Sequence, residues 1–289
     1  MRRANAALRG GTYFMPELKI GFVGAGRIAR ALARGFVQAK LARASGITAS
    51  DPSREAIEQF AAAVPDSRVV GSNAELVSGA DVVVLAVKPQ HLGPALAELR
   101  GSVSAEVLVV SVVAGATIAT LIEGLGTRRV VRVMPNTPCL IGQGATGYAM
   151  GPGTNEGDAK LVSDLFGSVG VAFEVPEDLL NVVTGLSGSG PAYVYTVIEA
   201  IMDGAVQMGM PRETALRLAA QTVRGAAAMV IDTGQSPAVL RDQVASPGGT
   251  TIAGLNALEK HGLRAALAAA VEAATNRARE LAGESSKSR

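Results

Sequence analysis

The sequence is poor in residues that build cross-links and metal sites: it has one cysteine, Cys139, two histidines and no tryptophan among 289 residues. A single cysteine excludes a disulfide within the chain and a cysteine-based metal site, and it fits a reducing, cytoplasmic setting. The histidines, His91 and His261, lie far apart and have no metal-ligand spacing, so no metal is expected. Aromatic residues make up only 3% and hydrophobic residues 48%, which predicts a sizeable, mainly aliphatic core.

An excess of charge of either sign is also missing. The net charge is +2 at pH 7 and the basic residues are spread along the chain, which argues against a nucleic-acid partner. No uninterrupted apolar run is long enough to span a membrane, so no membrane partner is expected. Residues 1–16 hold three arginines and no acid but lack the apolar centre of a targeting peptide. They are predicted to be a disordered extension ahead of a start at Met15, and residues 284–289 a disordered tail.

The first half of the chain alternates short β-rich runs with helical stretches. Several runs are continuous Val, Ile and Leu, as expected for strands buried on both faces. This alternation predicts a parallel, doubly wound α/β sheet over residues 17–177. The clearest runs are Leu18–Val23, Gly46–Ser50, Asp81–Val87, Val107–Val112 and Arg129–Met134, with weaker ones at Ala145–Ala149 and Val171–Glu174.

From about residue 177 onward the pattern is helical, which predicts an all-α domain over residues 178–283. The stretch from Pro191 to Met208 is apolar almost all round and is broken by Glu199 and Asp203. A helix of this kind must be buried on every side, which favours a subunit interface over packing within its own chain. Helices are expected at Asp178–Gly185, Gly190–Met208, Arg212–Thr233, Pro237–Ala245, Thr250–His261 and Leu263–Ala282.

A glycine motif follows the first strand directly. The order Gly24-Ala25-Gly26-Arg27-Ile28-Ala29 matches G-x-G-x-x-A between a strand and an apolar helix. In this context Gly24 permits the tight turn, Gly26 lets a pyrophosphate approach the backbone, and Ala29 keeps the helix close to the sheet. The helix N-terminus offers N–H groups and the positive end of its dipole to the phosphates. The motif therefore predicts a dinucleotide site.

Asp51 ends the second strand at about the spacing expected for a ligand of the adenosine ribose. A carboxylate there favours the unphosphorylated cofactor because it repels a 2′-phosphate. Ser50, Ser53 and Arg54 lie beside it as candidate phosphate ligands, although an ordinary solvated helix residue explains Arg54 equally well. The residues leave the choice between NADH and NADPH open.

Two more segments close strands of the same sheet. Ala86–Pro89 follows the third strand, and Ser111–Gly115 follows the fourth. Because ligands of open α/β sheets bind beyond the carboxyl ends of the strands, both loops are expected to border the cofactor. Lys88, beside Pro89, is a candidate contact of cofactor or substrate rather than a plain surface lysine.

Two glycine- and serine-rich segments, Gly185–Tyr193 and Ala245–Thr251, interrupt the helical half. A loop of this kind at a helix start presents N–H groups and hydroxyls to an anion such as a small carboxylate. Ordinary helix capping explains one such segment. Two of them, in a chain that has a dinucleotide site, favour a substrate pocket.

The helical half is short of strong acids and bases, because no lysine lies between Lys160 and Lys260 and His261 is its only histidine. A cyclic imine suits this scarcity. Its protonated iminium form is already electrophilic, so the protein mainly has to orient it against a nicotinamide. A hydroxyl such as that of Thr251 is a candidate hydrogen-bond partner for the ring nitrogen.

Four strings together resemble the pyrroline-5-carboxylate reductase family: VASPGGTTI at 244–252, TGLSGSGPAY at 184–193, AVKP at 86–89 and MPNTP at 134–138. The resemblance runs from about Leu18 to Leu281. It implies NAD(P)H-dependent reduction of 1-pyrroline-5-carboxylate to L-proline, the last step of proline biosynthesis, usually with NADPH and often also with NADH. It further implies an N-terminal Rossmann domain and a C-terminal helical dimerisation domain that interlocks in a homodimer, with five dimers assembling into a decamer.

The resemblance also assigns site residues. Thr251 matches the threonine whose hydroxyl meets the substrate's ring nitrogen, which makes it the candidate catalytic residue. The loop that holds the substrate's carboxylate matches Ser246, Pro247, Gly248, Gly249 and Thr250. Cofactor contacts match Val23, Gly24, Ala25, Gly26, Arg27, Ile28, Asn73, Ala86, Val87, Lys88, Pro89, Val112, Val113 and Ala114, and Asp51 stands where relatives commonly carry a small polar residue.

Two other functions stay open. A β-hydroxyacid dehydrogenase has the same two-part architecture, but it relies on a catalytic lysine at the domain junction. The absence of lysine from residue 161 to 259 argues against it. A non-catalytic NAD(P)-binding regulatory protein needs the first half of the chain but not the paired Gly/Ser segments of the second.

Overall fold

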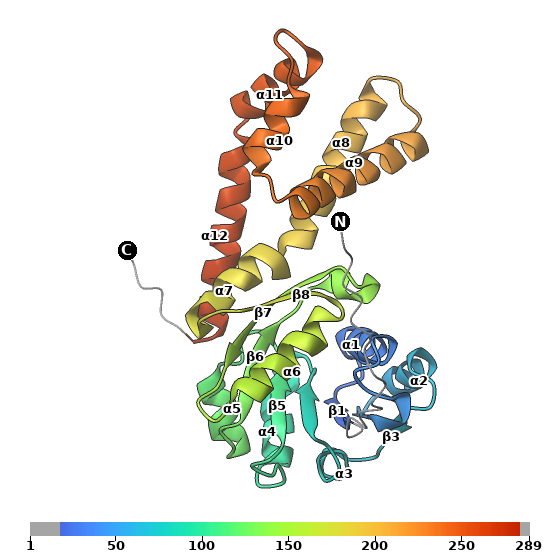
Figure 1. Cartoon of the computed structure of the whole chain (residues 1–289), viewed down its shortest axis with the longest axis vertical. Coiled ribbons are helices and arrows are strands. Elements are labelled where there is room, and N and C mark those ends of the chain that lie inside the picture. The colour runs from blue at the N-terminus through green and yellow to red at the C-terminus, as the bar shows by residue number, and fades with distance from the viewer. Residues whose placement is uncertain (1–17, 284–289) are drawn as a thin grey trace, which may run out of the picture. The chain divides into compact units, whose positions relative to one another are not determined.

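The strands of the protein form one eight-stranded sheet. The computed structural model describes residues 18–283, and the predictions for residues 1–16 and 284–289 lie outside that part. The strands are β1 (Ile20–Val23), β2 (Ile47–Ser50), β3 (Arg68–Val69), β4 (Val82–Leu85), β5 (Leu108–Ser111), β6 (Val130–Met134), β7 (Gly144–Met150) and β8 (Gly170–Glu174). Their order is β3-β2-β1-β4-β5-β6-β7-β8 (Figure 1). Every predicted run falls on one of these strands, and only β3, whose two residues are too short for a pattern, was not predicted.

The sheet has the doubly wound order that the sequence predicts. Strand β1 pairs in parallel with β2 on one side and with β4 on the other. The pairs β2–β3, β4–β5 and β7–β8 are parallel as well. Because the chain leaves β3 at one edge and returns beside β1 as β4, the order reverses between β1 and β4. Ligands of such sheets bind beyond the carboxyl ends of the strands at this switch point.

Four phenylalanine rings of the first half, Phe22, Phe36, Phe60 and Phe166, form one cluster. Helices α1 (Arg27–Gln38), α2 (Arg54–Ala63), α3 (Asn73–Val77), α4 (Leu92–Leu99), α5 (Ile118–Leu125) and α6 (Glu156–Gly167) accompany the strands. Phe22 of β1 lies 6.3 Å from Phe36 of α1 and 5.8 Å from Phe60 of α2, measured between ring centroids. All three rings are fully buried. The core is therefore aliphatic, as predicted, except for this cluster, which holds α1 and α2 against β1.

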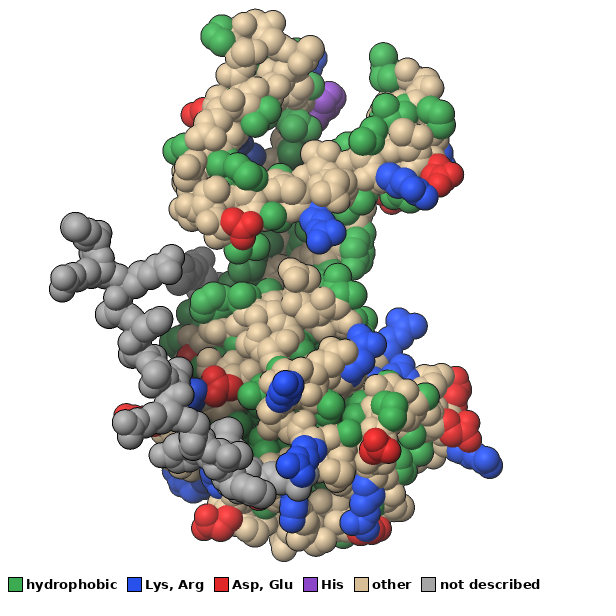
Figure 2. Space-filling view, turned by 45° about the vertical axis from the view of Figure 1, so that its right-hand side comes forward, with side chains coloured by type: hydrophobic (Ala, Val, Ile, Leu, Met, Phe, Trp, Pro, Cys, Tyr) green, Lys and Arg blue, Asp and Glu red, His purple; other side chains and the backbone are tan. Residues whose placement is uncertain are grey.

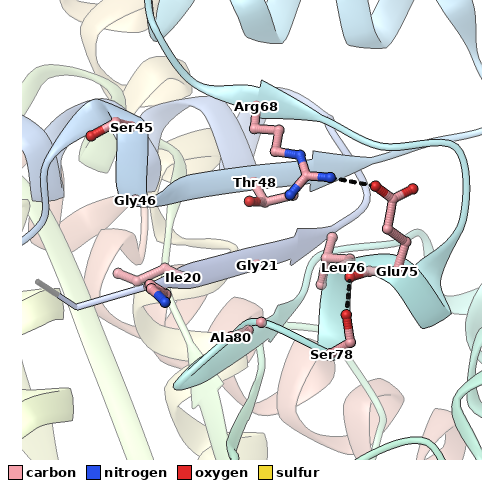
Figure 3. Close-up of a pocket in the computed structure, with 12 residues that line it drawn as sticks. Ile20, Gly21, Ser45, Gly46, Thr48, Arg68, Glu75, Leu76, Ser78 and Ala80 are labelled. Atoms are coloured by element: carbon pink, nitrogen blue, oxygen red, sulfur yellow. Dashed lines mark hydrogen bonds and ion pairs between the residues drawn. The ribbon is translucent and has the colours of Figure 1, made fainter.

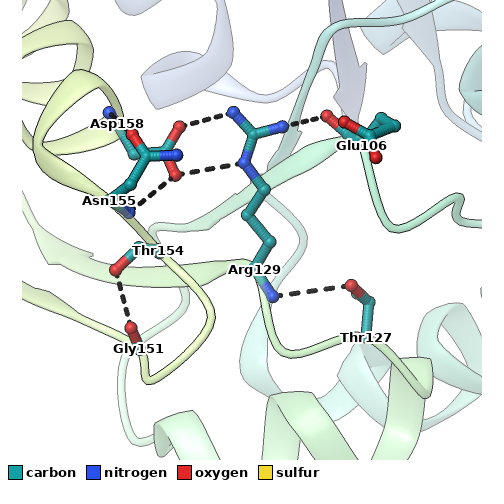
Figure 4. A network of polar contacts seen from close by, with 7 residues as sticks. All are labelled: Glu106, Thr127, Arg129, Gly151, Thr154, Asn155 and Asp158. Carbon is teal, nitrogen blue, oxygen red and sulfur yellow. Dashed lines mark hydrogen bonds and ion pairs between the residues drawn. The ribbon is translucent and has the colours of Figure 1, made fainter.

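A polar network holds α6 against the start of β6 (Figure 4). Asp158 is buried and accepts hydrogen bonds from Arg129 through Nη2 at 2.6 Å and Nε at 3.1 Å. The same carboxylate accepts from the N–H of Asn155, whose side chain accepts from the N–H of Asp158, so the two residues form a capping box. The hydrogen bond and the charge of Asp158 raise the pKa of Arg129.

The second half is helical, and five of the six predicted ranges agree with the structure to within one residue, whereas the predicted helix Asp178–Gly185 is divided into three short turns. A short turn, Glu177–Leu179, leads to α7 (Leu180–Val183), a π turn (Thr184–Gly188), α8 (Gly190–Gln207), α9 (Arg212–Thr233), α10 (Pro237–Val244), α11 (Thr250–Lys260) and α12 (Leu263–Leu281). Helices α8 and α9 pack side by side as an antiparallel pair, and α12 packs on α7 and the π turn (Figure 1). Within residues 18–283, no helix is both long and apolar enough to cross a membrane.

The chain divides into two compact units that are not continuous in sequence. The first comprises the described residues up to 113 together with 118–131 and 150–169, and the second comprises 114–117, 132–149 and the described residues from 170 onward. The predicted cut at residue 177 therefore does not coincide with these units. Direct packing is the reason. A Cβ on Gly147 of β7 would lie 2.8 Å from the Val183 side chain, and buried Arg132 of β6 donates to Glu177 and Asn181.

Much of the helical surface of the second unit is apolar and exposed. In α8 only Met202 is buried, although the sequence predicts burial on every side. Val194, Tyr195 and Ile201 are exposed, and Ile231 of α9 has 77% of its surface accessible. Figure 2 shows hydrophobic side chains on the surface of the helical part. The chain alone thus does not bury this helix pair, which contradicts packing wholly within one chain. An apolar surface of this extent marks a site of association.

Candidate functional site

The carboxyl ends of four strands in the first unit, β1, β2, β4 and β5, lie side by side. The N–H of Gly24 donates to the carbonyl of Ser50 at 2.8 Å, and the N–H of Ala86 donates to the carbonyl of Val23 at 2.8 Å. The N–H of Val112 donates to the carbonyl of Leu85 at 3.0 Å. The structure therefore brings together the glycine motif, the end of β2 and the loops after β4 and β5, as the strand-end argument predicts.

The two glycines of the motif have different structural reasons. Gly24 has φ of +99°, and a Cβ there would lie 2.8 Å from the carbonyl oxygen of Ala86, so only glycine fits. Gly26 precedes α1 as its N-cap without a side-chain cap, and a Cβ built on it meets no atom within 4 Å. The start of α1 therefore faces open space, with Ala29 fully buried behind it. This is an arrangement into which a phosphate fits.

Asp51 is fixed by two backbone donors. Its Oδ2 accepts from the N–H of Ala25 at 2.9 Å, and its Oδ1 accepts from the N–H of Ser53 at 2.8 Å. Two of the three candidate phosphate ligands are engaged elsewhere. The Ser53 hydroxyl caps α2, and Arg54, with 92% of its side chain exposed, pairs with Glu58. Asp51 thus ties the end of β2 to the glycine loop.

A cavity of about 290 Å³ opens at this edge. Five of the predicted cofactor residues line it: Val23, Gly24, Asp51, Asn73 and Val87. Its other lining residues are Ser50, Pro52, Gly71, Ser72, His91, Pro94, Ala95 and Glu98. Only Ser50 of these had drawn attention in the sequence. The signal for His91 and Glu98 is their position on the helical segment that directly follows the loop after β4.

Glu98 is a neighbour of a predicted cofactor contact that no sequence motif marks. Its Oε1 accepts from the N–H of Asn73 at 3.1 Å and its Oε2 accepts from Asn73 Nδ2 at 2.7 Å. Glu98 lies on α4 and Asn73 starts α3, so the pair is formed across 25 positions. One carboxylate therefore both caps α3 and orients the side chain of a predicted cofactor contact.

The remaining predicted contacts do not line this cavity. Arg27, Lys88 and Pro89 are exposed, Ile28 is half-buried, and Ala25 is buried inside the turn. The Val113 side chain is buried and its N–H donates to Ser111 Oγ at 3.3 Å, so only its backbone is positioned at the strand end. Ala114 is exposed and groups with the second unit.

A larger cavity, of about 400 Å³, lies at the opposite ends of the same strands (Figure 3). It is lined by Lys19 and Gly21 at the start of β1 and by Gly46 and Thr48 at the start of β2, and an ion pair joins Arg68 to Glu75 beside it. Parallel sheets bind ligands at their carboxyl ends, because the loops and helix N-termini that face ligands are there. The smaller cavity is therefore the candidate cofactor site.

The second unit contains the predicted substrate loop, residues 246–251. The N–H of Gly249 donates to the carbonyl of Ser246 at 3.0 Å, and Gly248 has φ of +68°. The positive φ favours glycine at 248, whereas a Cβ on Gly249 would meet the rotatable Ser246 Oγ at 2.3 Å. Gly249 is also the N-cap of α11 and offers no side-chain cap. The first turn of α11, which contains Thr250 and Thr251, is thus open to an anion.

The other Gly/Ser segment is not a loop, and the prediction that it presents N–H groups to an anion is wrong. Its chain stays helical through the π turn, and the Ser187 hydroxyl donates to the carbonyl of Val183. A Cβ on Gly185 would lie 2.4 Å from Thr275 Oγ1 of α12. The glycine is therefore needed for close helix packing. Asn136 donates to the carbonyl of Ser187 at 3.0 Å, which anchors the π turn.

The described residues include neither a cluster of metal ligands nor a reactive thiol. Within residues 18–283, no three His, Cys, Asp or Glu side chains are placed to share a metal ion. Cys139 is buried, and burial raises the pKa of its thiol, which disfavours the reactive thiolate.

Two family models match the chain. The model "Pyrroline-5-carboxylate reductase dimerisation" matches residues 177–281, and "NADP oxidoreductase coenzyme F420-dependent" matches residues 19–115. A pyrroline-5-carboxylate reductase of Arabidopsis thaliana is 46% identical over 269 residues, which cover 92% of this chain and 96% of the relative. One of Methanosarcina acetivorans is 45% identical, with 92% and 99% covered. The crystal structure of Plasmodium falciparum pyrroline carboxylate reductase with NADP bound is 35% identical, with a TM-score of 0.83, and covers 93% of this chain and 99% of that one.

Proposed function

The chain belongs to the pyrroline-5-carboxylate reductase family, and we propose that it reduces 1-pyrroline-5-carboxylate to L-proline with NADPH or NADH, the last step of proline biosynthesis. The observation that carries this proposal is 46% identity over 92% of the chain to a reductase of that name. The strand-end cavity supports it, because its glycine turn and the open start of α1 fit a dinucleotide.

The reaction transfers a hydride to the carbon of the protonated C=N bond, the iminium form, so the nitrogen keeps its proton as N–H and loses its positive charge. The bound nicotinamide supplies the hydride, and this chain's residues bind and orient both reactants. We propose that the first turn of α1 holds the pyrophosphate, with the loops at Ala86–Pro89 and Val112–Ala114 beside the cofactor. In the helical half, the turn at Ser246–Thr250 offers uncapped N–H groups for the substrate's carboxylate. We propose that the Thr251 hydroxyl hydrogen-bonds the ring nitrogen.

Turnover of purified full-length protein tests the proposal. Mixing it with 1-pyrroline-5-carboxylate and either reduced cofactor should consume the cofactor's near-ultraviolet absorbance and produce proline. A dehydrogenase of β-hydroxyacids would instead oxidise a hydroxyacid, and a regulatory protein would bind the cofactor without turnover. Absence of proline formation with both NADPH and NADH would exclude the reductase function.

We also propose that residues 178–283 form the substrate-binding and dimerisation domain, that five such dimers form a decamer, and that the protein is cytoplasmic. The exposed apolar faces of α8 and α9 support association of two copies. The single, buried cysteine supports a reducing compartment.

Charge placed on the helix pair should break this association. Ile231→Glu on α9 is expected to shift the assembly toward monomers, because burying an unpaired carboxylate at an interface is unfavourable by a free energy on the order of several kcal/mol. Ile141→Glu is the matched control, since Ile141 is 78% and Ile231 is 77% exposed. Light scattering reports the molar mass of each variant. If the molar mass of Ile231→Glu is the same as that of the wild type, this face of α9 does not lie in the interface.

A further inference from the structure

The candidate cofactor cavity is acidic. Two carboxylates, Asp51 and Glu98, line it, whereas neither lysine nor arginine does among the residues described, and His91 is the one ionisable base on its wall. An acidic side chain at the end of the second strand normally marks the adenosine ribose position, and a nearby arginine accommodates a 2′-phosphate. Such a phosphate adds about two negative charges near neutral pH. The walls therefore favour a hydroxyl over a phosphate on that ribose.

The Asp51 side chain is held in place by hydrogen bonds that oppose its rotation away from a phosphate. Turning it away would break its bonds to the N–H groups of Ala25 and Ser53, one of which belongs to the glycine turn itself. Each carboxylate oxygen accepts more than one hydrogen bond, so both still have a lone pair for ribose hydroxyls. The Asp51 carboxylate can thus accept hydrogen bonds from two ribose hydroxyls, and its charge repels a phosphate.

Glu98 adds a second bias through Asn73. Because Asn73 Nδ2 donates one of its two hydrogens to Glu98 at 2.7 Å, the orientation of the amide is fixed, with Oδ1 as an acceptor and one N–H as the remaining donor. An amide oxygen accepts a hydrogen bond from a ribose hydroxyl but not from phosphate oxygens. Glu98 is exposed on α4, so its own repulsion of an anion is screened by salt. Arg54, the nearest candidate counter-charge in sequence, is already paired with Glu58.

We propose that this site selects NADH over NADPH, with Asp51 as the ligand of the ribose hydroxyls and Glu98 as a positioning residue that acts through Asn73. The proposal rests on the reductase function only where turnover is measured. The dissociation constants of the two cofactors test it independently of any reaction.

Titration of nicotinamide fluorescence with NADH and NADPH gives these constants for the full-length protein, and kcat/KM with 1-pyrroline-5-carboxylate gives the matching turnover ratio. We expect the wild type to bind NADH about tenfold or more tighter at low salt, with the difference narrowing as salt rises. Glu98→Gln should move the ratio of the two constants toward NADPH by about tenfold, and Asp51→Ser by more. Glu123→Gln, which removes an exposed charge on α5 outside the cavity, should leave the ratio unchanged.

Three results would overturn the proposal. The first is a wild type that binds NADPH as tightly as NADH. The second is a Glu98→Gln variant in which both constants change by the same factor, since that shows a purely structural role. The third is a preference that does not depend on salt. If both cofactors bind with the expected ratio but no proline forms, the reductase function fails and the selectivity stands.

Discussion

Replacing Thr251 with alanine is expected to lower kcat about a hundredfold while the dissociation constant of the cofactor stays nearly the same. Thr251 lies in the first turn of α11, next to the Ser246–Gly249 turn, and not among the residues that line the dinucleotide cavity. Loss of its hydroxyl removes the proposed hydrogen bond to the substrate's ring nitrogen. The orientation of that ring toward the hydride donor then depends only on the bonds between the Ser246–Thr250 loop and the substrate's carboxylate.

Steady-state kinetics at saturating cofactor, combined with direct cofactor titration, separates this effect from a binding defect. Thr251→Ser keeps the hydroxyl and loses only the methyl group, so it should retain most of the turnover. Asn256→Ala is a control on the same helix, since Asn256 is exposed and lies outside the proposed substrate loop. A Thr251→Ala variant with normal kcat but weak cofactor binding would place the residue in the dinucleotide site instead. Equal losses for serine and alanine would show that the methyl group, not the hydroxyl, matters.

Features set by local sequence were predictable. Several strands of the first half are continuous apolar runs, and glycine, aspartate or proline follows β1, β2 and β4 closely, so their carboxyl ends could be aligned without coordinates. The ends of the long helices were likewise predicted from proline and glycine residues at their boundaries. Helix α9 starts after Pro211 and ends at Gly234, which adopts φ of +64°. Both signals depend on neighbours within a few positions.

Contacts between distant positions were not predictable. The hydrogen bond between Asn73 and Glu98 depends on how α4 packs beside α3. Neither residue belongs to a sequence motif that predicts this hydrogen bond. Gly185 looked like part of an anion loop because glycine and serine are common in such loops. Its actual role depends on the approach of Thr275, which lies 90 positions away in α12. Composition cannot distinguish a glycine that faces a ligand from one that faces another helix.

The largest loss of stability is expected for Asp158→Ala, which should lower the free energy of unfolding by about 2–4 kcal/mol. Asp158 is only 2% exposed and accepts from two nitrogens of Arg129 and from the N–H of Asn155. Alanine would leave the guanidinium, whose side chain is 26% exposed, without its carboxylate partner, and it would also remove half of the capping box of α6. A stranded, partly buried charge is less favourable than an apolar replacement of the pair.

Asp164→Ala provides the matched control on the same helix. Asp164 also pairs with a cation, Lys160, but the two side chains are 45% and 75% exposed, so the expected loss is about 0.5 kcal/mol or less. Urea denaturation of the two variants, followed by circular dichroism, gives the comparison. The double replacement Arg129→Met with Asp158→Leu should recover part of the loss, because it removes the stranded charge along with its partner. If Asp158→Ala proves no less stable than Asp164→Ala, the network contributes to the geometry of α6 rather than to its stability.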